Sequence, residues 1–109
     1  MLVGLTQKHH DTYSDFYNST KENEHLSSRE GLLVGLSAAM AMNCIPCQRF
    51  YLLECKKAGI TREAISEVLA KVMAVSAGQK RLQFQEVLDR FQIQLQDFDG
   101  QSSEANSEA

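Results

Sequence analysis

The chain has 109 residues, of which 43% are hydrophobic and 23% charged, an ordinary composition for one globular domain. Its net charge of −3 gives no basic surface that would grip phosphates, so nucleic acid is not an expected partner. A single proline and six glycines argue against a loop-rich sandwich. Because so short a chain buries only about two-thirds of its unfolded surface, we expect it to gain stability from contacts between subunits.

Apolar residues recur at helical spacing along almost the whole chain, with no hairpin signal and no internal repeat. This pattern predicts an all-α domain of about five helices. The first helix is expected over about residues 6–23. Ser27 and Glu30 form the pattern of a capping box, which predicts a second helix from there to about Met42. That helix is apolar nearly all round, and a helix without a polar stripe indicates a homo-oligomer.

A third helix is predicted to open at Cys44-Ile45-Pro46-Cys47, whose proline suits a first helical turn. It should run to Ala58, with Gly59 as a left-handed stop. Thr61 is a candidate N-cap for a fourth helix. We expect Gly78 to separate this helix from a fifth.

The chain is expected to divide into four parts: an N-terminal helix over 1–25, a core over 26–81, a C-terminal helix over 82–98 and a disordered tail over 99–109. The tail has nothing apolar larger than alanine, so it cannot offset the entropy cost of ordering.

Neither an export signal nor a membrane span is predicted. The apolar stretch at the N-terminus is too short for the hydrophobic core of a signal peptide, and no basic residues precede it. Residues 31–48 hold no charge, but Asn43 and Pro46 interrupt them, which favours a buried helix and a turn over a membrane span. Three cysteines in an unexported chain are expected to be reduced thiols in the cytoplasm.

The pair Cys44 and Cys47 is the sharpest chemical feature. Two thiols separated by two residues can form a disulfide, and the unpaired amides at a helix start would stabilise the Cys44 thiolate. A thiolate attacks peroxides or disulfides, and its neighbour can resolve the oxidised product. The alternatives are a pair of buried small hydrophobes or half of a metal site.

A metal site is not favoured, because zinc would need two further ligands at suitable spacing. Cys55 lies about 12 Å from Cys47 along one helix, too far for a shared ion or a disulfide. We therefore expect no metal and no cofactor, and interpret Cys55 as a core residue rather than one acting between subunits.

The stretch from Leu26 to Arg81 resembles the carboxymuconolactone decarboxylase and AhpD-like alkylhydroperoxidase superfamily. The resemblance rests on the small-residue helix that ends in Asn43-Cys44-Ile45-Pro46-Cys47 and on Lys57-Ala58-Gly59-Ile60-Thr61 after it. It implies an all-helical trimer or hexamer and a peroxidatic and resolving cysteine pair. It also implies recharging by a thiol reductant of lipoyl or thioredoxin-like type.

Two positions depart from the family pattern. The family has Glu twelve residues before the first Cys and His four residues after the second, where this chain has Leu32 and Tyr51. Tyr51 is a candidate catalytic residue because it can donate a hydrogen bond, although its pKa of about 10 makes it a poor base. Helix electrostatics favours Cys44 as the attacking thiol, whereas the resemblance favours Cys47, so this choice stays open.

The sequence therefore predicts a slow thiol–disulfide oxidoreductase or alkylhydroperoxidase that acts on a peroxide or a protein disulfide. The alternative is a non-catalytic oligomeric scaffold or a redox-sensing binding protein of the same fold.

Overall fold

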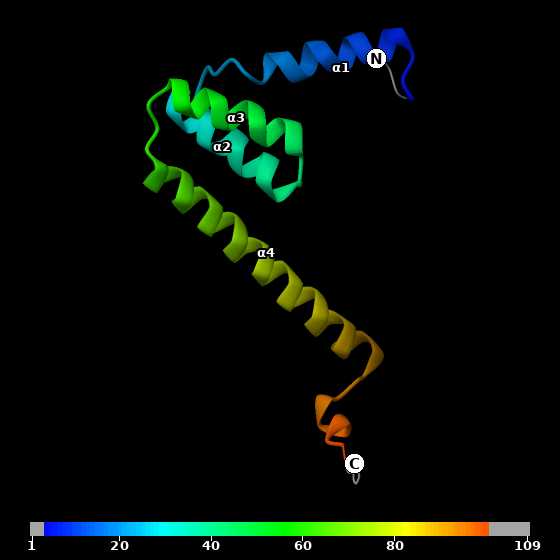
Figure 1. The fold of residues 1–109 in the computed structure, drawn as a ribbon. Coiled ribbons are helices and arrows are strands. Elements are labelled where there is room, and N and C mark those ends of the chain that lie inside the picture. Colours follow the sequence, from blue (N-terminus) through cyan, green and yellow to red (C-terminus); the bar gives the residue numbers. More distant parts are fainter. Residues whose placement is uncertain (1–3, 101–109) are drawn as a thin grey trace. The chain divides into compact units, whose positions relative to one another are not determined.

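The computed structural model describes residues 4–100, and all the regular secondary structure in this part of the chain is helical. Four α-helices, followed by one short 3-10 helix, are α1 (Gln7–Ser19), α2 (Ser28–Ala41), α3 (Ile45–Lys57), α4 (Arg62–Phe91) and η1 (Leu95–Phe98) (Figure 1). No strand occurs between residues 4 and 100. The predicted all-α class is confirmed. Contacts divide the chain into one unit up to Val72 and a second from Met73.

The first unit is built around an antiparallel hairpin of α2 and α3, which lie side by side (Figure 1). The predicted capping box begins α2: Glu30 N donates to Ser27 Oγ at 3.0 Å, and Ser27 N donates to Glu30 Oε1 at 2.8 Å. After α2, Asn43 adopts a left-handed φ of 58°, which reverses the chain into α3. Short polar side chains tolerate this conformation better than branched ones, so asparagine suits the turn.

The core of the hairpin is small. Leu36 and Ala39 of α2 and Cys55 of α3 are the buried hydrophobic residues among those described. Val34, on the same helix as Leu36, is 55% exposed. The apolar side chains of α2 therefore lie on two faces of the helix. One face is buried in the hairpin, and the other is exposed to solvent in a single chain.

The predicted end of α3 is confirmed. Gly59 has a φ of 73°, and Ile60 N donates to the carbonyl of Cys55 at 3.1 Å. This hydrogen bond satisfies a carbonyl that the helix end would otherwise leave without a partner. Thr61 then caps α4 as predicted, because its Oγ1 accepts a hydrogen bond from Ala64 N at 3.2 Å.

The expected break at Gly78 is wrong. The helix α4 is 30 residues long and includes Gly78. Its ribbon is unbroken in Figure 1. One glycine inside a helix costs about 1 kcal/mol relative to alanine, which good helix formers on both sides can outweigh. The helix ends instead at Phe91, and the next residue, Gln92, has a left-handed φ of 55°. The predicted C-terminal helix over 82–98 is thus the last part of α4, a short connection and η1.

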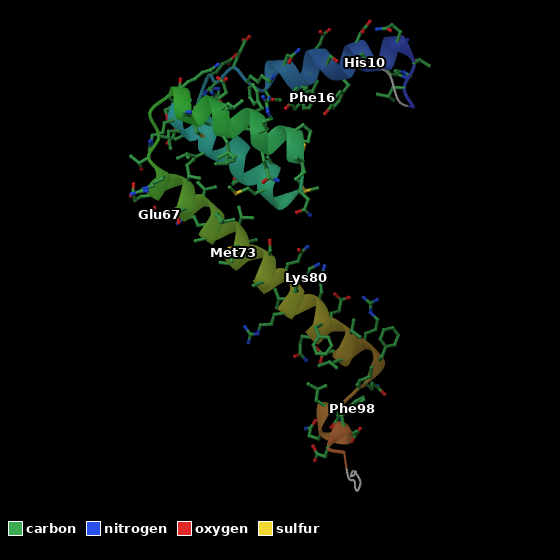
Figure 2. All side chains as sticks on the ribbon, in the orientation of Figure 1. His10, Phe16, Glu67, Met73, Lys80 and Phe98 are labelled. Carbon is green, nitrogen blue, oxygen red and sulfur yellow. A yellow bond between two sulfur atoms is a disulfide. The ribbon has the colours of Figure 1, made fainter. Side chains whose placement is uncertain are left out.

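Many side chains of the second unit project from a single helix, as Met73 and Lys80 do in Figure 2. Leu82 is 71% exposed and Phe91 63% exposed. No described helix is long and apolar enough to cross a membrane. Of the tail predicted over 99–109, the part from residue 101 lies outside the described residues.

Candidate redox site

Cys44 and Cys47 form a disulfide at the start of α3. Their Cα atoms are 5.2 Å apart, and both residues are half-buried. Cys44 is the N-cap of the helix, with extended backbone angles of −89° and 98°, and Pro46 lies in the first turn. The position of the pair at a helix start therefore agrees with the sequence prediction.

The start of α3 places partial positive charge close to the cysteine pair. The first amide bonded to a carbonyl of the turn is Gln48 N, which donates to Cys44 O at 2.9 Å. The amides of Ile45 and Cys47 precede it and have no carbonyl four residues back within the helix, while Pro46 has no N–H. Partial positive charge from these groups and from the helix dipole favours a thiolate over a thiol in the reduced pair.

Tyr51 lies one turn beyond Cys47 on α3 and is half-buried against α2. Its ring packs over Gly35, where a Cβ would overlap the ring carbons. The ring also meets Phe50 edge to face, with centroids 5.0 Å apart. Burial raises the pKa of the Tyr51 phenol, and the nearby Tyr17 raises it further. Tyr51 is therefore a neutral hydrogen-bond donor at neutral pH and a poor base.

The two positions at which the chain departs from the family pattern come together. Leu32 of α2 and Tyr51 of α3 line the same small hollow, of about 90 Å³. Its complete lining is Thr20, Lys21, Asn23, Gly31, Leu32, Phe50, Tyr51 and Glu54. Neither cysteine of the pair belongs to this lining.

Two charged residues of the hollow were not singled out from the sequence. Glu54 follows Tyr51 by one helical turn, and its carboxylate pairs with Lys57 at 3.1 Å. This spacing on α3 is a signal that could have found it. Lys21 comes from the segment after α1, and its Nζ lies 4.5 Å from the centre of the Phe50 ring. Nothing in the local sequence indicates that contact.

Cys55 is separate from the pair. It is 1% exposed and reduced, and burial raises the pKa of its thiol. Arg29 lowers this pKa by a smaller amount, and Glu54 raises it. Its burial agrees with the prediction of a core residue. Within residues 4–100, no group of three His, Cys, Asp or Glu side chains could hold a metal ion.

Sequence comparison identifies the family. Residues 7–89 match the model of the carboxymuconolactone decarboxylase family, a span that contains the whole α2–α3 hairpin and its cysteine pair. The chain belongs to the carboxymuconolactone decarboxylase family. The predicted resemblance is thereby confirmed at the level of the family, which includes AhpD-like members.

A solved structure supports the same fold. A protein from Methanobacterium thermoautotrophicum, solved by a structural genomics consortium, has a TM-score of 0.67 and 24% sequence identity. The similarity covers 73% of this chain and 90% of that one. At this identity the likeness concerns the fold alone. No curated protein matches the chain.

Proposed function

We propose that this member of the carboxymuconolactone decarboxylase family is a thiol–disulfide oxidoreductase of the AhpD-like kind, with Cys44 and Cys47 as its redox pair. The observation that carries the proposal is the half-exposed disulfide at the N-terminus of α3. Its position allows the helix to stabilise a thiolate, and its partial exposure gives a substrate access.

With a hydroperoxide as the oxidant, the chemistry takes two steps. One thiolate attacks the terminal peroxide oxygen, the O–O bond breaks, and the alkoxide takes a proton to leave as an alcohol, which gives a sulfenic acid. The second thiol of the pair then attacks the sulfenic sulfur, and a disulfide and water form. A protein disulfide as substrate would instead exchange with the pair and become reduced.

The first step is expected to be slow. Leu32 and Tyr51 leave the site without the carboxylate and imidazole of the family pattern, and acid–base help of this kind contributes about 100- to 10,000-fold. Tyr51 can still donate a hydrogen bond to a thiolate or to the leaving oxygen. A thiol reductant of lipoyl or thioredoxin-like type would return the pair to the dithiol. We propose that these reactions take place in the cytoplasm.

The test starts from the reduced protein and one equivalent of an organic hydroperoxide, followed by intact mass and peptide mapping. We expect a loss of two hydrogens, located in a single peptide that holds Cys44 and Cys47 as an internal disulfide. Cys44→Ser and Cys47→Ser should each abolish this disulfide, whereas Cys55→Ala, the matched control at the third cysteine, should retain it. Turnover that persists in both serine variants would overturn the proposal.

The second candidate is a non-catalytic oligomeric scaffold or redox sensor, which the replacements at Leu32 and Tyr51 favour. Exposed apolar surface supports an oligomer in either case. Beside the cysteine pair, Met42 is 76% and Ile45 72% exposed, in a chain with three buried hydrophobic residues between positions 4 and 100. A homo-oligomer, trimeric or hexameric, would cover such surface.

Light scattering on the reduced and oxidised protein separates these candidates. A mass that is a multiple of the monomer in both states, together with disulfide formation by peroxide, supports the enzyme. A mass that changes with the redox state of the pair supports the sensor. Thiols that resist both alkylation and peroxide support the scaffold.

A further inference from the structure

The side chain of Gln48 connects the redox pair to the end of α2. Its Nε2 donates to the carbonyl of Ala39 at 3.4 Å, in a partly buried position. The same carbonyl accepts the amide of Cys44 at 3.0 Å. One buried acceptor on α2 thus receives both the backbone of the first cysteine and a side chain from the turn that holds the second.

Hydrogen bonds connect Ala39, Cys44 and Gln48 to one another. Gln48 also donates its own amide to the carbonyl of Cys44 at 2.9 Å, so it reaches Cys44 directly and Ala39 through its side chain. Ala39 is 4% exposed and lies in the core of the hairpin. The carbonyl that accepts the Cys44 amide therefore belongs to a buried residue of the hairpin core.

We infer that Gln48 is a positioning residue for the Cys44–Cys47 pair, one that holds Cys44 within reach of Cys47 when the disulfide is open. This inference rests on the proposed redox function. While the disulfide is closed, the covalent bond itself restrains Cys44. After reduction, the hydrogen bonds to Ala39 restrain the turn together with the hydrogen bond from Gln48 N to Cys44 O.

The consequence is a difference between the two redox states. Loss of the Gln48 hydrogen bond gives the reduced turn more freedom than the oxidised turn, because the disulfide already limits the latter. The equilibrium protein disulfide + 2 glutathione ⇌ protein dithiol + glutathione disulfide therefore shifts towards the dithiol. Closure of the disulfide from a sulfenic acid slows for the same reason.

The test measures this equilibrium in glutathione buffers for the full chain. The variants are Gln48→Met, which keeps the length and loses the donor, and Gln48→Glu, which puts a carboxylate against the carbonyl. The matched control is Arg49→Met on the exposed side of the same turn. We expect both Gln48 variants to favour the dithiol by about two- to tenfold, the range for one hydrogen bond, and the control to match the natural protein.

A second measurement separates positioning from general stability. Urea unfolding of the oxidised and reduced forms should give a larger loss of stability for the oxidised form of each Gln48 variant, because a shift of the folded pair towards the dithiol means that the folded disulfide form is destabilised more than the folded dithiol form. Equal losses in both forms, with an unchanged glutathione equilibrium, would overturn the inference while leaving the redox function intact. A natural protein that forms no disulfide across these buffers would overturn the proposed function, and the positioning role with it.

Discussion

Gly35 of α2 lies so close beneath the ring of Tyr51 that an added Cβ would overlap the ring carbons. The contact joins the two helices that carry the site, one turn beyond Cys47. A glycine at this position is therefore a requirement of packing, because its backbone is ordinary helix and needs no positive φ. The large side chain at position 51 fits only because position 35 has no side chain.

The first prediction concerns this contact. Gly35→Ala should destabilise the protein by about 1–3 kcal/mol, because the hairpin must open or Tyr51 must leave its position. Thermal or urea unfolding measures the effect. Gly78→Ala is the matched control, since nothing lies within 4 Å of a Cβ there, and it should stabilise by about 0.5–1 kcal/mol. Equal effects of the two substitutions would contradict the contact.

A second prediction restores the family pattern. The double variant Leu32→Glu, Tyr51→His should speed disulfide formation by hydroperoxide by about 100-fold or more, because it supplies a carboxylate and an imidazole in one hollow. Stopped-flow mixing followed by acid quench and mass analysis measures the rate. The control is Leu32→Gln, Tyr51→Phe, which offers similar volumes without titratable groups. A double variant no faster than this control would show that acid–base help is not what limits the rate.

The raised pKa of Tyr51 gives a pH dependence. In the unfolded chain the phenol loses its proton around pH 10, whereas burial in the folded protein makes it hold the proton to a higher pH. Stability from this residue is thus complete below pH 10 and is lost as the pH rises towards the folded pKa. Urea unfolding between pH 8 and 11 should give a shallower decline for Tyr51→Phe than for the natural protein. Parallel declines would contradict the burial of the phenol.

The buried thiol gives a prediction that needs no redox chemistry. Cys55 should react with iodoacetamide far more slowly than either cysteine of the reduced pair, because it is 1% exposed and burial raises its thiol pKa. Peptide mapping over a time course measures all three rates in one sample. Unfolding in urea should remove the difference. Fast labelling of Cys55 in the native protein would mean that the hairpin opens readily.

The local signals along the chain predicted most helix ends correctly. Ser27 with Glu30, Gly59 and Thr61 act through hydrogen bonds or backbone angles within a few residues, so their roles can be found without knowledge of the fold. The prediction of a helix break at Gly78 was wrong because it used a local signal alone. The cost of this glycine is local and small, while the decision to continue a helix depends on all its neighbours over several turns.

The sequence by itself determined the helical class, the family and the position of the Cys44–Cys47 pair at the start of α3, because each depends on spacing along the chain. Only the tertiary structure decided what surrounds the pair. The ring of Tyr51 over Gly35 and the link from Gln48 to Ala39 join α2 to α3. Such contacts follow from how two helices pack, and packing depends on the shape of every side chain between them rather than on any periodicity.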